Sequence, residues 1–148
     1  MKRIIVSIFI IISILSCDHQ LNSKVEEAVN KVAKQKVVYP GWETESEAFQ
    51  NLNKEASVED LIYLTDNENA YVRYYAFIGL REKKYPKMLD IYKKHKTDFE
   101  EISTSNGACI NGSNEIRLLM LSAINPENPQ YKWLTKTEYD KLWEELFK

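Results

Sequence analysis

Two cysteines and two histidines are the side chains of this sequence best suited to nucleophilic or metal chemistry. Cys109 lies in the glycine-flanked stretch SNGACINGSN, where a thiol could act as a nucleophile, form an intermolecular disulfide or pack as a small apolar group. A nucleophilic thiol needs a nearby cation or helix N-terminus to lower its pKa, and no histidine lies beside Cys109 in the sequence. The favoured interpretation is therefore a buried or structural cysteine in a stretch that is a candidate functional loop.

The histidines do not predict a metal site. His95 and Asp98 are three residues apart and could supply two ligands from one helix face, but no third ligand lies nearby. His19 stands in a polar segment and is expected to be solvated. No Ser/His/Asp set, nucleophile elbow or phosphate-binding glycine loop is present. We therefore expect no metal, no cofactor and no enzymatic activity, with an enzyme that uses Cys109 as the alternative.

Cys17 stands between an apolar run and a polar segment, which indicates a different role. Lys2 and Arg3 precede a stretch, residues 4–15, that is apolar apart from two serines, as in a secretory signal. An apolar run of about 12 residues is too short for a membrane-spanning helix, which needs roughly 20. The sequence ILSC, residues 14–17, resembles the lipobox of bacterial lipoproteins.

This resemblance implies that residues 1–16 are a signal peptide and that Cys17 is acylated and becomes the new N-terminus. Acyl chains suit an anchor, since each buried CH₂ contributes about 0.8 kcal/mol and two chains bind stably where one is marginal. The lipid bilayer is then one partner, and the expected location is the non-cytoplasmic side of the bacterial inner or outer membrane. An ordinary signal peptide with an incidental cysteine is the alternative.

The net charge of the chain that remains after removal of the signal peptide restricts the classes of partner that it is expected to bind. Removing Lys2 and Arg3 from the 20 basic side chains leaves 18 against 22 acidic ones, a formal charge of −4. An acidic, mixed-charge surface argues against nucleic acid, which requires a basic face, and offers no polybasic support for lipid binding. Residues 17–23 are expected to be the lipidated cysteine and a tether, and residues 24–148 a single domain. Cys109 has no partner within that mature chain, so no internal disulfide is expected.

Apolar residues recur at helical spacing along the domain, which predicts an all-α fold. Capping boxes are expected at Ser23, Thr44, Ser57 and Thr137, each followed three residues later by Glu or Asp. The predicted helices cover residues 24–36, 45–56, 58–65, 70–84, 86–99, 115–124 and 138–147, although a short strand would also fit the apolar run at 115–124.

Two stretches stand out from this pattern. The helix at 70–84 is apolar almost all round, which is typical of a helix packed on several sides and places it at the centre of the domain. Residues 103–114 gather glycine, serine and asparagine, which predicts the longest loop of the domain.

The sequence DLIYLTDNENAYVRYYAFIGLRE, residues 60–82, resembles a HEAT repeat, in which a short helix ends at an Asp/Asn turn and a second helix begins with a Val-Arg pair. The resemblance implies a short, solenoid-like array of α-α hairpins with a HEAT-like core at about residues 57–99. It also implies that Arg73 bonds back to the turn, with Asp66 or Asn69 as its partner. Small Ala76 and Gly79 would let the paired helices approach. An irregular helical bundle is the alternative.

Tyrosines crowd the two central helices. Tyr71, Tyr74, Tyr75 and Tyr92 are candidate partner-binding residues, because tyrosine combines a large ring with a polar tip and is enriched at interaction hot spots. The alternative is that these rings fill the core. Together with the anchor, they indicate a membrane-bound scaffold or adaptor that binds a protein or peptide of unknown identity. An immunity-type inhibitor of a toxin is a second hypothesis.

Overall fold

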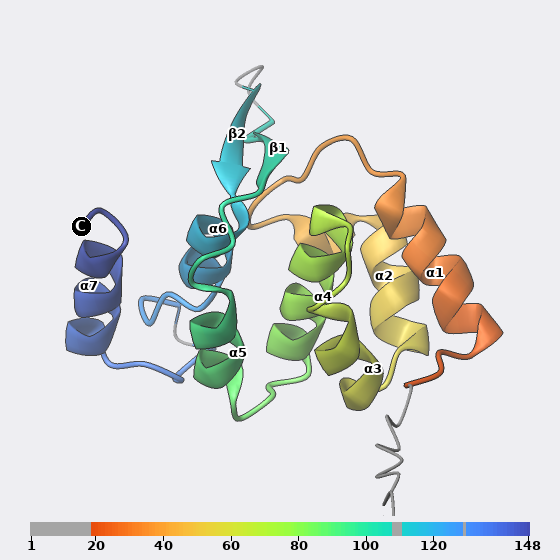
Figure 1. Ribbon diagram of the computed structural model, residues 1–148, viewed down its shortest axis with the longest axis horizontal. Helices are drawn as coiled ribbons and strands as arrows, with labels where there is room; N and C mark the ends of the chain where they lie inside the picture. The colour runs from red at the N-terminus through yellow and green to blue at the C-terminus, as the bar shows by residue number, and fades with distance from the viewer. Residues whose placement is uncertain (1–18, 108–110, 129) are drawn as a thin grey trace, which may run out of the picture.

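The computed structural model describes residues 19–107, 111–128 and 130–148. The expected signal peptide, Cys17 and Cys109 lie outside these residues. Within them, the chain forms mainly α-helices, as predicted, together with a short 3-10 helix and a two-stranded antiparallel sheet that were not predicted (Figure 1).

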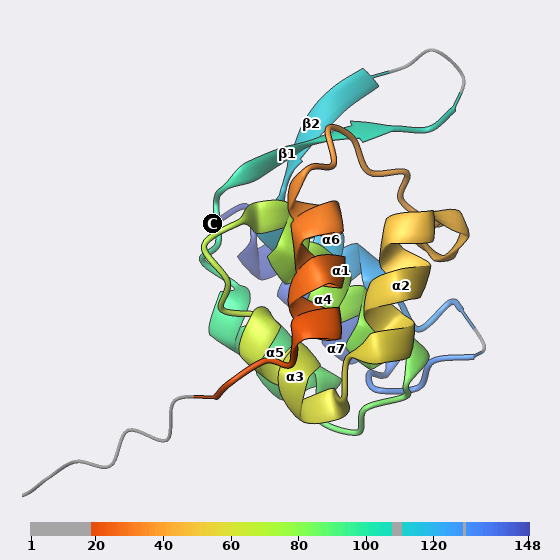
Figure 2. The same cartoon turned by 90° about the vertical axis from the view of Figure 1, so that its right-hand side faces the viewer.

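The α-helices are arranged along a row that begins with α1 and ends with α7, with α5 and α6 at the same position along it (Figure 1). Their bounds are α1 Ser23–Ala33, η1 Glu43–Glu45, α2 Glu47–Glu55, α3 Val58–Leu64, α4 Ala70–Glu82, α5 Met88–His95, β1 Glu101–Ser105, β2 Asn111–Glu115, α6 Ile116–Ala123 and α7 Lys136–Glu145. The hairpin β1–β2 projects from one end of the helices, beside the connection between α1 and α2, and the start of α1 lies at the opposite end (Figures 1 and 2).

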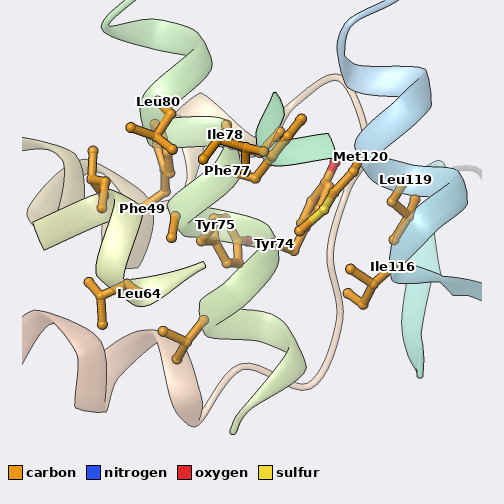
Figure 3. Close-up of a cluster of buried hydrophobic side chains, with 14 of the residues drawn as sticks. Phe49, Leu64, Tyr74, Tyr75, Phe77, Ile78, Leu80, Ile116, Leu119 and Met120 are labelled. Atoms are coloured by element: carbon orange, nitrogen blue, oxygen red, sulfur yellow. The ribbon is translucent and has the colours of Figure 1, made fainter. Parts of the chain in front are cut away.

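Helix α4 lies at the centre of the domain, as its all-round apolar character predicts. Every residue from Val72 to Arg81 is buried, and α4 packs against α1, α2, α3, α5 and α6. Figure 3 shows its side chains meeting those of Phe49 on α2, Leu64 on α3 and Met120 on α6. Burial of these large side chains, each contributing about 1.5–3 kcal/mol, provides the main driving force for folding.

Helices α3 and α4 form a tightly packed hairpin. The predicted capping box at the start of α3 is confirmed, since Ser57 accepts from the Asp60 N–H and Asp60 accepts from the Ser57 N–H. A Cβ atom added at Gly79 would lie 3.0 Å from both terminal methyl carbons of Leu61. The predicted close approach at Gly79 is therefore confirmed.

Arg73 bonds back to the turn between α3 and α4, as predicted, but its partners there are Asn67 and Glu68 and not Asp66 or Asn69. Its Nη1 donates to the carbonyl oxygens of Asn67 and Glu68 at 2.9 and 2.8 Å. Its Nε donates to Asp98 at 2.8 Å, and its Nη2 donates to Glu100 at 2.6 Å. One buried guanidinium thus fixes both the turn and the segment that leads from α5 into β1.

Several predicted helix boundaries are wrong. The N-caps are Asn22 for α1, Ser46 for α2 and Thr135 for α7, in place of Ser23, Thr44 and Thr137. Asn, Ser and Thr can all cap a helix, so closely spaced candidates compete and the tertiary contacts decide. Before α2, residues 43–45 form the 3-10 helix η1, so α2 starts later than predicted and its N-cap is Ser46.

The prediction of a loop at residues 103–114 is also wrong, because most of these residues belong to the β1–β2 hairpin. Along β1, Glu101 and Ser103 are exposed and Ile102 and Thr104 are buried, which is the alternation of a half-buried strand. Strand β2 is exposed and polar, and it is held by its ladder with β1 and by a bond of 2.7 Å from Asn114 Nδ2 to Thr104 Oγ1. Helix α5 ends at His95, so the predicted helix to residue 99 is too long.

Candidate functional site

A groove of about 560 Å³ with a mainly apolar lining lies at the hairpin end of the domain. The connection between α1 and α2 forms one side, and Asn106 and Gly107, which follow β1, form the other. Its aromatic lining comes from Tyr39, Trp42 and Tyr75.

Two of these rings are exposed to an unusual degree. The exposed fraction is 61% for Trp42 and 45% for Tyr39, whereas Tyr75 is buried and packs against Phe49 with its ring centre 5.9 Å away. Solvent-exposed aromatic rings beside an apolar recess are a common feature of binding sites, because each ring has a large area to bury against a partner.

The segment that carries Val37 and Tyr39 is held in place by β1. Val38 donates its N–H to the Ser103 carbonyl and accepts from the Ser105 N–H, both at 2.9 Å, in a parallel bridge. Tyr71 extends this pairing, since its hydroxyl donates to the Lys36 carbonyl at 3.0 Å and accepts from the Ser103 N–H at 3.3 Å. The groove therefore has an extended backbone segment along one side.

Glu43 fixes the part of the same connection that carries Trp42. Its carboxylate is buried, with Oε1 accepting from the Tyr74 hydroxyl at 2.5 Å and Oε2 lying 3.8 Å from Arg81 Nη2. Burial raises the pKa of Tyr74 well above its usual value, and the neighbouring Glu43 raises it further. A neutral tyrosine thus holds η1 on α4 and keeps Trp42 beside the groove.

The structure corrects the interpretation of the tyrosines. Tyr74, Tyr75 and Tyr92 are each 1% exposed, so their rings fill the core and do not form an exposed partner-binding surface. Tyr74 and Tyr75 lie on α4, which packs against five other helices, and Tyr92 lies on α5, which packs against α4 and α6. Tyr71 is half-buried and its hydroxyl bridges two backbone segments. Of these residues, Tyr75 contributes to the groove.

The sequence suggested that His19 is solvated, but in the structure it contacts α3. Its Nε2 lies 2.7 Å from Asp60 Oδ1, and its ring centre lies 4.8 Å from that of Tyr63. Burial raises the pKa of Asp60, but bonds from Ser57 and His19 outweigh this effect and lower it overall. His19, four residues before the start of α1, is therefore packed against α3.

His95 and Asp98 do not form a shared ligand pair. Asp98 accepts from Arg73, while His95 is buried and lies 3.5 Å from Asp66. Across residues 19–107, 111–128 and 130–148, no three His, Cys, Asp or Glu side chains gather closely enough to hold a metal ion. In the same ranges, no helix has the length and apolar character required to cross a bilayer.

The sequence analysis missed Tyr39 and Trp42. Both lie in the stretch YPGW, between the helices predicted at residues 24–36 and 45–56. Aromatic residues on both sides of a turn were the available signal, although their exposure depends on segments remote in sequence.

The groove offers aromatic faces, the exposed carboxylate of Glu45 and open backbone, which suit binding. In comparisons with known proteins, the chain matches no protein-family model, no curated protein and no solved structure, so the function has to be argued from this geometry.

Proposed function

We propose that the protein is an exported, lipid-anchored scaffold that binds a protein or peptide partner in the groove beside Trp42. The single observation that carries this proposal is the exposure of Trp42 and Tyr39 at the groove, on a segment that Glu43 and Val38 fix to the core. Rings held in place before binding lose little conformational freedom when a partner covers them.

The scaffold in this proposal is HEAT-like. The capping box at Ser57, the close packing of Gly79 on Leu61 and the bonds from Arg73 to the turn support a HEAT-like hairpin of α3 and α4. Such hairpins present a rigid surface because each helix packs on its neighbours along the row.

The lipid anchor in this proposal also determines how the groove is oriented relative to the membrane. Two residues of chain reach at most about 7 Å, so an acylated Cys17 would hold His19, and with it α3, close to the bilayer. His19 is bound to Asp60 near the start of α3, at the end of the domain away from the hairpin (Figure 1). The groove would then face away from the membrane, where a partner can reach it.

Replacement of Trp42 tests the groove. The full-length protein, with a C-terminal tag, is extracted in detergent and used to capture partners, alongside Trp42→Ala and the control Trp143→Ala. Trp143 is 39% exposed on α7, at the other end of the row of helices. The partner should be retained by the wild type and the control and lost from Trp42→Ala. Equal capture by both variants would show that the groove is not the binding site.

Replacement of Cys17 tests the anchor separately. Cys17→Ser should give an unprocessed or soluble protein that incorporates no radiolabelled palmitate, whereas the control Cys109→Ser should be processed normally. A Cys17→Ser protein that is still cleaved and still partitions with membranes would rule out lipidation as the anchor.

A further inference from the structure

The groove has an open backbone edge at Val37. Val38 directs both its N–H and its C=O toward β1. Successive residues of an extended strand point these groups to opposite sides, so those of Val37 point away from β1. Neither group of Val37 is hydrogen-bonded to another described residue, and Val37 lines the groove. The segment is therefore an unpaired strand edge next to two exposed aromatic rings.

The charge at this part of the groove is negative. Glu43 and Glu45 are its charged lining residues among those the structure describes. Glu43 is buried against Tyr74 and Arg81, so it faces inward. Glu45 is exposed, and none of the ion pairs found in the described residues includes it. One open carboxylate in a groove that Tyr39 and Trp42 also line is an environment that attracts a cation.

The groove continues into a second recess. A shallower recess of about 340 Å³ shares Gln35 and Ser46 with it and continues between the end of α1 and the start of α2. Lys31, Lys34 and Glu47 line that continuation, so its lining carries more positive than negative charge. The preference for a cation is therefore confined to the part of the groove near Trp42 and Glu45.

We propose that the groove takes an extended peptide segment that pairs with the backbone of Val37 and places a lysine or arginine side chain against Tyr39 and Trp42, within reach of Glu45. This inference rests on the proposed function, because it names the chemical class of the partner. Pairing with an open strand edge gives affinity that does not depend on sequence, and the side-chain position gives the selectivity.

Matched synthetic peptides test both parts of the inference on the full-length protein in detergent. The probe is a fluorescein-labelled pentapeptide of alternating threonine and valine with a central arginine, and its partner peptide has a central glutamate. Fluorescence polarisation should show about tenfold tighter binding of the arginine peptide. Glu45→Gln should reduce this ratio to about twofold. The control Glu59→Gln, an exposed acidic residue on α3, should leave the ratio unchanged.

Backbone methylation tests the strand pairing. Two further arginine peptides carry N-methyl groups on alternate residues, one on the odd and one on the even positions. Because only one set of N–H groups can face Val37, one of these peptides should lose binding and the other should retain it.

Three results would overturn the inference. Equal binding of the arginine and glutamate peptides would exclude a basic residue, and equal behaviour of the two methylated peptides would exclude strand pairing. If the wild type binds none of the peptides but still captures its partner in a Trp42-dependent manner, the inference fails and the proposed function stands. If capture does not depend on Trp42, it is the proposed function that fails.

Discussion

The hydroxyl of Tyr74 donates a hydrogen bond of 2.5 Å to Oε1 of Glu43, and both side chains are buried. This bond joins the centre of α4 to η1, the short helix that begins directly after Trp42. Glu45 lies on the same short helix, two residues further on. The position of both groove residues therefore depends on a bond made in the core, so Tyr74 acts as a positioning residue and not as a contact for the partner.

Removing this hydroxyl should weaken both the fold and the groove. Tyr74→Phe leaves the buried Glu43 carboxylate without its donor, which we expect to lower the free energy of unfolding by about 1–3 kcal/mol. Urea denaturation followed by circular dichroism measures the loss, and binding of the arginine peptide should fall in the same variant. Tyr63→Phe is the control, because Tyr63 is exposed on α3. Equal stability of the two variants would mean that the bond to Glu43 contributes nothing.

The buried tyrosines should also make the protein sensitive to alkali. Burial raises the pKa of Tyr92 to about 12 and that of Tyr74 well above its usual value. A pKa that is higher in the folded state means that the folded protein holds the proton more tightly than the unfolded chain does. This contribution to stability is fully present below the unfolded pKa of about 10 and is lost as the pH rises through the folded values.

We therefore expect stability to decline above a pH of about 10, with the ionisation of the buried tyrosines appearing together with unfolding. A titration followed by absorbance and circular dichroism tests this, and Tyr74→Phe should show a smaller decline than the wild type. Ionisation of all tyrosines near their ordinary pKa, with the helical signal intact, would contradict the burial of Tyr74 and Tyr92.

Arg73 should not be replaceable by lysine. Its guanidinium donates at once to two turn carbonyls and to the carboxylates of Asp98 and Glu100, a set that one ammonium group cannot span. Because Glu100 is half exposed, we expect Arg73→Lys to cost about 2–3 kcal/mol, below the range for fully buried pairs. Lys94→Ala, which removes an exposed pair with Asp66, should cost less than about 1 kcal/mol in the same denaturation assay. A similar cost for both variants would show that Arg73 is not a structural clamp.

The central helix and the close α3–α4 packing could be predicted because their signals are local. The apolar faces of α4 and the small Gly79 stand in one short stretch of sequence. Strand β2 could not be predicted, because its sequence NGSNE has no apolar alternation and forms a strand only through its ladder with β1.

The groove was missed for a related reason. Trp42 is exposed while the next residue, Glu43, is buried and accepts a hydrogen bond from Tyr74. Tyr74 lies 31 positions away from Glu43 in sequence. The contact between His19 and Asp60 spans 41 positions in the same way. Contacts of this kind depend on the packing of α4 and α3, which no periodicity within the interacting segments encodes.

The packing of Gly79 on Leu61 gives a prediction in which two effects oppose each other. Alanine favours a helix over glycine by about 1 kcal/mol, so Gly79→Ala would stabilise an unobstructed helix. Here the added methyl group would lie 3.0 Å from both terminal methyl carbons of Leu61, which is fully buried between α3 and α4. Overpacking of this kind costs about 1–3 kcal/mol, so the net effect should be a loss of about 1 kcal/mol.

The sign of the effect should reverse once the obstructing methyl groups are removed. In a Leu61→Ala background, Gly79→Ala should raise the free energy of unfolding, because only the helix preference remains. Gly112→Ala is the control for a glycine without neighbours, since no atom lies within 4 Å of the Cβ position at that residue on β2. Urea denaturation of the single and double variants measures the coupling. A gain in stability from Gly79→Ala in the wild-type background would show that α3 and α4 are not as close as this contact requires, and that the hairpin has room to adjust.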